Sequence, residues 1–384
     1  MEPKYKKVNF CRVCNSKRII DLEVNKKFYL ANLDKIIGIN YSLCSDCNFV
    51  FQSEYVGDDF LNFYYERSPM LRRENPTPFE IDQNFRQSGF VSRNLDIESK
   101  SVLEIGAHAG SFLSHLLEEF NCDCYFEELS EEARKLLSSK KGLKDYRKNS
   151  SKKIDLIILR HVLEHIFDLE AFFNYLKTIT NYNSYLFIEV PDWTSPGKNT
   201  DPLMFEHLSQ FNSYNLNYLL NLHGFSIEAL EKSVNPNDPA TPNKVLRVIA
   251  KLNLKDKRES IKNQFNDYAE KQLFGWIKEL NEVLRENKNK SIALYPASHL
   301  SFDAILNSNL KEYNLLGLYD LDKKKHNKKY LGLKVFPTNQ LIKDNPDIVL
   351  LFTLAFEPEI RKSFCDLGLT SKVISLNELI KMCN

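Results

Sequence analysis

The sequence has no excess of charge of either sign and no long apolar run. Its 52 Lys and Arg residues are balanced by 51 Asp and Glu residues, which leaves a formal net charge of +1. This balance removes the electrostatic reason to expect DNA, RNA or an anionic membrane as the main partner. No apolar stretch approaches the ~20 residues that a membrane span needs. The segment Met1–Cys11 lacks the apolar stretch of a signal peptide, so we expect a cytoplasmic protein without a membrane partner.

Solenoid-type repeats and low-complexity tracts are absent as well. With 384 residues the chain is too long for one compact core, so several domains are expected. The apolar and charged contents, 43% and 27%, are ordinary for a globular protein. The pattern of motifs divides the chain into three blocks, which we predict to be domains: 1–75, 76–252 and 253–384.

The central block alternates strand-like apolar runs with amphipathic helical segments. This alternation is typical of a parallel sheet covered by helices on both faces. The clearest strands are expected at 101–105, 155–159 and 185–190. A later pair of runs, at 225–230 and 245–250, could form the antiparallel edge of the same sheet. The sequence therefore predicts an α/β fold with a doubly wound, Rossmann-like central sheet.

The last block begins with a polar helical segment at about 256–287 and then repeats the α/β pattern. Its strands are expected at 291–295, 315–319 and 347–352. We therefore predict a second, smaller Rossmann-like domain at the C-terminus.

Two pairs of cysteines in the first block have the spacing C-x-x-C. In a reducing compartment such pairs favour a metal over a disulfide. The thiolates of Cys11, Cys14, Cys44 and Cys47 can surround a zinc ion tetrahedrally. No histidine lies near to leave an open coordination position, so we expect structural Zn²⁺. The alternative is four free or redox-active cysteines.

A glycine turn follows the first central strand, in the sequence Leu103-Glu-Ile-Gly106-Ala-His-Ala-Gly110. Glycine allows a tight turn and a close approach to a ligand. Glu104 can bind a cationic amino group, which a pyrophosphate-binding turn would avoid. This favours S-adenosylmethionine, which has an amino group and no phosphate, although such spacing also occurs in ordinary strand-to-helix turns.

Two acidic residues end the second central strand, in the sequence Cys124-Tyr-Phe-Glu127-Glu128. An acidic residue at this distance from the glycine turn is placed to accept hydrogen bonds from ribose hydroxyls. Either glutamate could serve, and we favour Glu128, which directly precedes the start of a helix. Alternatively, both glutamates only enrich the first helical turn.

Histidines follow the third and fourth strands. His161 and His165 lie four residues apart and would share one face of a helix. Together with Glu164 they resemble a zinc spacing, but the order H-E-x-x-H is absent. One of them is expected to be structural or to line the methionine pocket, and the other could take part in chemistry. Glu206 and His207 come after the next strand, where a histidine could take a proton from a substrate or simply pack the loop.

These motifs, in this order and continued by Phe187–Asp192, resemble the class I S-adenosylmethionine-dependent methyltransferases. The resemblance implies that Glu128 holds the ribose and that Arg160 and His161 approach the methionine end. The residues that it implies for the rest of the cofactor site are Glu104, Gly106, Ala107, Gly110 and Leu129.

The whole arrangement resembles the sugar C-methyltransferases of deoxysugar biosynthesis, which act on nucleotide-linked keto sugars. It implies that His207 is the base, that Glu206 is its partner and that His165 stabilises the oxyanion. The substrate-facing residues would be Tyr64 or Tyr65, and Trp193. Met204 stands where that family has a tyrosine, so an O- or N-methyltransferase and a catalytically silent cofactor-binding protein stay open as alternatives.

Overall fold

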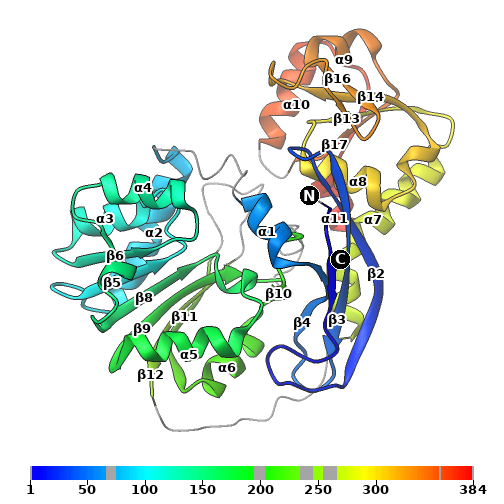
Figure 1. The fold of residues 1–384 in the computed structure, drawn as a ribbon. Coiled ribbons are helices and arrows are strands. Elements are labelled where there is room, and N and C mark those ends of the chain that lie inside the picture. The colour runs from blue at the N-terminus through cyan, green and yellow to red at the C-terminus, as the bar shows by residue number, and fades with distance from the viewer. Residues whose placement is uncertain are drawn as a thin grey trace.

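The computed structural model describes residues 2–65, 75–193, 204–233, 245–253, 266–353 and 356–382. The described residues form three sheets, and each sheet belongs to one of the three predicted blocks. Figure 1 shows the N-terminal sheet between the central domain and the C-terminal domain.

The N-terminal module is an antiparallel sheet followed by one helix. Its elements are β1 (Tyr5–Lys7), β2 (Ile19–Leu30), β3 (Lys35–Cys44), β4 (Val50–Val56) and α1 (Asp58–Tyr65). The strands have the order β1-β4-β3-β2. Ile37, Ile39 and Tyr41 are buried while the residues between them are more exposed. This period of two places one face of β3 in the core.

The central domain is the predicted parallel sheet with helices. Its elements are α2 (Pro78–Asn94), β5 (Ser101–Ile105), α3 (Ser111–Glu119), β6 (Asp123–Glu127), α4 (Glu131–Ser139), β7 (Lys144–Asp145), η2 (Tyr146–Lys148), β8 (Ile154–Arg160), η3 (Leu163–His165), α5 (Leu169–Ile179), β9 (Thr180–Pro191), β10 (Ser209–Gln210), α6 (Ser213–Leu222), β11 (Phe225–Ser233) and β12 (Val245–Leu252). The sheet order is β11-β12-β9-β8-β5-β6-β7. β12 pairs antiparallel with both β9 and β11, so the predicted antiparallel edge is confirmed.

The chain changes direction across the sheet at β5, which places a ligand site. β5 pairs in parallel with β6 on one side and with β8 on the other. In open α/β sheets, ligands bind at the carboxyl ends of the strands where the order reverses in this way. The residues at those ends are the ones that the sequence singled out.

The start of α2 coincides with the predicted boundary between the first two blocks. Thr77 caps the helix, its side chain accepting from the amide of Glu80, while the Glu80 side chain accepts from the amide of Thr77. Pro78 occupies the first helical turn, where its missing N–H is not needed. The helix therefore begins at Pro78 for local reasons.

The C-terminal domain is the second Rossmann-like sheet that the sequence predicts. Its elements are α7 (Asn266–Glu286), β13 (Ser291–Tyr295), α8 (His299–Asn307), η5 (Leu310–Glu312), β14 (Asn314–Asp320), β15 (Lys329–Tyr330), β16 (Leu333–Pro337), α9 (Thr338–Asp344), β17 (Ile348–Leu351), α10 (Glu357–Asp366), β18 (Lys372–Ser375) and α11 (Leu376–Met382). The order is β15-β16-β14-β13-β17-β18, and all pairs are parallel except β15 with β16.

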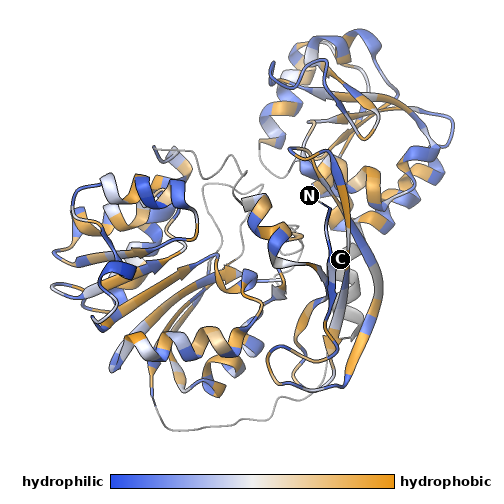
Figure 2. Ribbon diagram, in the orientation of Figure 1, coloured by the Kyte–Doolittle hydropathy of each residue, from blue (hydrophilic) through white to orange (hydrophobic). Residues whose placement is uncertain are grey.

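The hydrophobic cores connect the domains. One cluster of buried residues runs from Phe51 of the N-terminal module to Val190 of the central sheet. Another joins Tyr29 of β2 to Phe302 of α8, whose rings meet edge to face at 5.2 Å. Figure 2 shows the apolar residues concentrated on the strands and on one side of the covering helices. Across the described residues, every helix is too short or too polar to span a bilayer.

Candidate active site and metal centre

The glycine turn after β5 has the backbone that only glycine adopts readily. Gly106 and Gly110 have φ of 73° and 72°. A Cβ at Gly106 would lie 2.8 Å from the Val162 side chain, and one at Gly110 would lie 2.5 Å from the Leu137 side chain. Ala107 is buried within the turn. The turn at the head of α3 therefore depends on both glycines.

Glu104 is a buried carboxylate with one oxygen engaged. Its Oε1 accepts from Nε of Arg160 at 2.7 Å, and the guanidinium lies 4.3 Å from the ring centre of Phe112. Its Oε2 is buried and has no hydrogen-bond partner among the described residues. A buried acceptor without a donor is unfavourable, so this oxygen suits the ammonium group of a bound amino acid. The predicted role of Glu104 is compatible with this geometry.

The two candidate ribose carboxylates have different surroundings. Glu128 accepts from the amides of His108 at 3.1 Å and of Leu129 at 2.7 Å, so it ties the glycine turn to the loop after β6. The Leu129 side chain is exposed. Glu127 instead accepts from the hydroxyl of Tyr175. Glu128 thus faces the glycine turn, as favoured, and its ribose contact stays a prediction.

His161 lies outside any helix, and two carboxylates stabilise the positive charge of its ring. Its φ of 51° lies in the left-handed region, and only Leu163–His165 form a helical turn. The prediction that His161 and His165 share a helix face is therefore wrong. The His161 ring nitrogens lie 3.3 Å from Glu164 and 3.3 Å from Glu189. Burial opposes the charged ring, but these carboxylates outweigh it and raise the pKa of His161 to about 10.

His165 and His207 meet at the carboxyl edge of the sheet. Their rings pack edge to face with centres 4.8 Å apart. Nδ1 of His165 lies 2.9 Å from the carbonyl oxygen of Glu206. Because a carbonyl only accepts, Nδ1 carries the proton. Burial lowers the pKa of His165, which favours the neutral ring with an unprotonated Nε2.

Glu206 is a carboxyl group with an unusual proton affinity. Its Oε2 is buried without a hydrogen-bond partner in the described part of the chain. Burial raises the pKa of Glu206 to about 7. Tyr64 is its neighbour from α1: the Tyr64 ring packs edge-on against Phe205 at 4.7 Å, and burial, then the charge of Glu206, raise the pKa of Tyr64. Tyr64 and Glu206, two residues predicted for the substrate chemistry, thus lie close together.

Two further substrate predictions remain open. Tyr65 ends α1, and its side chain lies outside the described residues. Trp193 is buried, its amide donates to the carbonyl of Phe211 at 3.2 Å, and its indole nitrogen has no hydrogen-bond partner within the described ranges. A buried indole N–H without an acceptor is compatible with a ligand contact.

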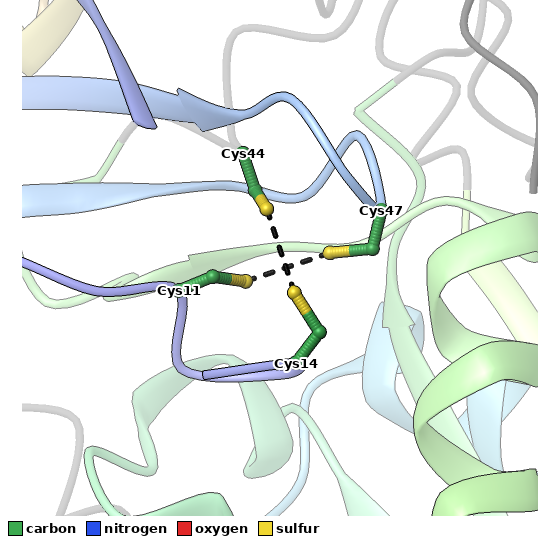
Figure 3. A group of neighbouring side chains, drawn as sticks. All are labelled: Cys11, Cys14, Cys44 and Cys47. Atoms are coloured by element: carbon green, nitrogen blue, oxygen red, sulfur yellow. Dashed lines mark hydrogen bonds between the residues drawn. The ribbon is translucent and has the colours of Figure 1, made fainter. Parts of the chain in front are cut away.

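The four cysteines of the C-x-x-C pairs point toward one centre (Figure 3). The Sγ atoms of Cys11 and Cys47, and those of Cys14 and Cys44, are 3.5 Å apart. All four lie within 4.8 Å of one another. These separations are too long for disulfides and close to the ~3.8 Å edge of a tetrahedron with Zn–S bonds of ~2.3 Å. The predicted cluster is therefore present and could hold a metal ion.

The two cysteine loops have the same backbone form. The residue after each second cysteine, Asn15 and Asn48, has φ of 57° and 53°. Each of these amides donates at 2.9 Å to the carbonyl of the first cysteine, Cys11 or Cys44. Asparagine adopts left-handed backbone more readily than most residues. The repeated C-x-x-C-N pattern was a signal that sequence reasoning missed.

A family model described as a methyltransferase domain matches residues 83–230. The match spans the glycine turn, both candidate ribose carboxylates and the histidine segments. The chain therefore contains an S-adenosylmethionine-dependent methyltransferase domain. This family implies S-adenosylmethionine as the cofactor, and the contacts of Glu104 and the glycine turn with it stay predictions.

Solved structures of other methyltransferases are similar to about half of this methyltransferase. An Aquifex aeolicus S-adenosylmethionine-dependent methyltransferase is 17% identical over 43% of this chain and 89% of its own, with a TM-score of 0.34. The 1,6-didemethyltoxoflavin-N1-methyltransferase of Burkholderia thailandensis is 14% identical over 54% and 97%, with a TM-score of 0.38. An Archaeoglobus fulgidus methyltransferase is 18% identical over 51% and 100%, with a TM-score of 0.36. No curated protein matches the chain.

The methyltransferase site also contains charged residues that sequence reasoning missed. Glu189 is buried on β9, where burial opposes its charge but His161 and Arg247 lower its pKa to about 2. Gln87 of α2 links this pair to the donor site, because it donates to Glu189 and accepts from Arg160, both at 2.7 Å. A charged residue in the middle of each apolar run was the available signal for Glu189 and Arg247.

Proposed function

We propose that the methyltransferase acts on a sugar, most simply a nucleotide-linked sugar, and methylates the carbon next to a ketone. The observation that carries the proposal is the packing of the His165 and His207 rings at the carboxyl edge of the sheet. Nδ1 of His165 bonds to the backbone carbonyl of Glu206, and the Glu206 side chain lies near Tyr64 of the N-terminal module. A carbon acid beside a ketone needs a base and a donor to the developing enolate oxygen. This group of side chains offers both.

The methyl donor, S-adenosylmethionine, would be held by the residues around the glycine turn. Glu104 has a buried carboxylate oxygen available for its ammonium group, and Glu128 lies beside the turn for the ribose. Arg160 holds Glu104 in position, because its Nε donates to the carboxylate at 2.7 Å. S-adenosylmethionine supplies a methyl group that its sulfonium charge has already activated.

The residues of this chain divide the proton chemistry. His207 removes the proton from the substrate carbon, and Glu206, whose pKa is near neutral, accepts or shares it. His165 can donate to the enolate oxygen only after its Nε2 is protonated, since its Nδ1 proton is used by Glu206. The Tyr64 hydroxyl keeps its proton because burial and Glu206 raise its pKa, so it is a second donor.

The deciding experiment incubates the purified protein with methyl-labelled S-adenosylmethionine and a panel of nucleotide-linked keto and hydroxy sugars. NMR then locates the methyl group. A new C–CH3 signal supports the proposal, whereas an O–CH3 or N–CH3 signal would replace carbon by oxygen or nitrogen with His207 still as the base. Transfer to none of the sugars would sink the sugar proposal.

The base is tested by His207→Ala. We expect turnover to be abolished while the donor affinity, measured by calorimetry, is nearly unchanged, because Glu104 and the glycine turn are intact. His299→Ala is the matched control, since His299 is exposed at the start of α8. Persistent activity in His207→Ala would show that another residue is the base.

We also propose that Cys11, Cys14, Cys44 and Cys47 bind structural Zn²⁺. The support is the near-tetrahedral spacing of their sulfurs. Elemental analysis should find one zinc per chain, and Cys44→Ser should lose it. Metal-free protein with an intact N-terminal module would contradict this assignment.

A further inference from the structure

We propose that Gln52 and Arg12 of the N-terminal module are positioning residues that hold the Glu206–His207 segment in its catalytic form. The inference deepens the proposed function and rests on it for the roles of Glu206 and His207. It concerns the main chain of one short segment, Met204–Leu208, which carries both residues.

In the described part of the chain, this segment forms a turn and belongs to no helix or strand. Within it, the amide of His207 donates to the carbonyl of Met204 at 3.1 Å. No helix includes these residues, and the next strand, β10, starts only at Ser209. The shape of a segment outside helices and sheets depends on the groups that donate hydrogen bonds to its carbonyls.

Gln52 supplies most of those groups. Its Nε2 lies 3.0 Å from the carbonyl of Phe205, 3.0 Å from that of His207 and 3.4 Å from that of Met204. The backbone N–H of Gln52 donates to the carbonyl of Leu208 at 3.0 Å. Gln52 is fully buried. One side chain therefore gathers the carbonyls on both sides of Glu206.

Arg12, in the first cysteine loop, also donates hydrogen bonds at the end of this segment. Its Nη2 donates to the carbonyl of Leu208 at 2.5 Å and to the carbonyl of Gln52 at 3.1 Å. The guanidinium is buried and lies over the rings of Phe51 and Phe167, at 5.7 and 5.4 Å. Arg12 stands between Cys11 and Cys14, so the cysteine cluster anchors its backbone.

The pairing of strands extends this contact. β10 pairs antiparallel with β4, with Ser209 opposite Phe51 and Gln210 opposite Val50. Directly after the segment that carries His207, the chain thus becomes a strand of the N-terminal sheet. From the central domain, His165 bonds to the carbonyl of Glu206 and Gln210 bonds to that of His207. The N-terminal module therefore helps to place the His207 ring, together with His165 and Gln210.

The test replaces Gln52 by methionine, which keeps the length of the side chain and removes its donors. We expect kcat to fall about 100-fold, as for a catalytic group displaced by about 1 Å. The donor affinity should stay unchanged, because the glycine turn makes no contact with Gln52 among the described bonds.

Asn40→Ala is the matched control. Asn40 lies on β3 and donates to Glu54 of β4 at 2.8 Å, so its removal weakens the same sheet without touching the segment. We expect its kcat to remain close to that of the parent. If Gln52→Met does not fold, Arg12→Met carries the same test, since methionine removes the Nη2 donor to both carbonyls.

A readout without turnover separates this inference from the proposed function. Carbon-13 labelled histidine gives one ring resonance for each histidine, and the His207 signal is identified by its loss in His207→Ala. We expect that resonance and its titration to shift in Gln52→Met and not in Asn40→Ala, whether or not any sugar is methylated. An unshifted His207 resonance in Gln52→Met, or an unchanged kcat where turnover exists, would overturn the proposal.

Discussion

Glu206 shows at the scale of one residue how burial can prepare a side chain for proton transfer. Its carboxyl group has an ordinary pKa of 4.5 that burial raises to about 7. It then carries a proton in part of the molecules at neutral pH. His161 has the opposite adjustment, because two carboxylates keep it charged. The site thus holds one permanent cation and one group that titrates near neutrality.

The raised pKa of Glu206 predicts how stability changes with pH. The folded protein binds a proton that the unfolded chain has already released between pH 4.5 and 7. Stability therefore falls as the pH rises through this window, by at most about 3 kcal/mol for a shift of this size. Glu206→Gln should remove that slope and be the more stable protein at pH 8.

Urea unfolding from pH 4 to pH 8 measures this difference. The control is Glu98→Gln, because Glu98 is exposed. Parallel pH profiles for the parent and Glu206→Gln would show that Glu206 ionises normally in the folded protein.

At the scale of elements, the turn from β5 into α3 is where we expect the methyl donor to bind. Gly110 caps α3 with a left-handed backbone, and its missing side chain leaves room for Leu137. We expect Gly110→Ala to cost about 1–3 kcal/mol of stability from the strained backbone alone. The contact with Leu137 adds to that cost and should weaken donor binding.

Gly368→Ala is the comparison that isolates this contact. Gly368 has φ of 80° but nothing within 4 Å of the position of a Cβ. Both variants carry backbone strain, and only Gly110→Ala should lose donor affinity in a calorimetric titration. Equal losses of stability and unchanged donor binding would mean that Leu137 moves aside without cost.

How far the elements could be predicted depended on how local their signals are. The strands of both parallel sheets were visible as apolar runs, and the four-cysteine cluster was visible as two short spacings. The left-handed backbone at His161 was not, because nothing in the order His161-Val-Leu-Glu-His165 signals a positive φ. The helical spacing therefore placed both histidines on one face, where the structure has a turn.

At the scale of the whole molecule, a buried ion pair joins the N-terminal module to the C-terminal domain. Nζ of Lys26 lies 2.9 Å from Asp303 of α8, and both side chains are at most 10% exposed. Asp303→Ala would leave a buried charge without this partner, so we expect a loss of about 3–5 kcal/mol. Lys26→Met combined with Asp303→Leu should recover most of it.

Chemical unfolding monitored in each domain tests this prediction. Lys135→Ala, which removes an exposed ion pair with Glu131, is the control and should change stability little. A small effect of Asp303→Ala would indicate that water or another residue reaches Lys26.

The sequence by itself determined the α/β class, the order of the three domains, the glycine turn and the cysteine cluster. Each of these depends on periodicity or on spacings of a few residues, which the chain carries wherever it folds. The grouping of Tyr64 with Glu206, and the bonds from Gln52 to a carbonyl 153 residues away, were decided only by the tertiary structure. These contacts arise where two sheets pack and where β10 pairs with β4, and packing between distant segments leaves no periodic trace in the sequence.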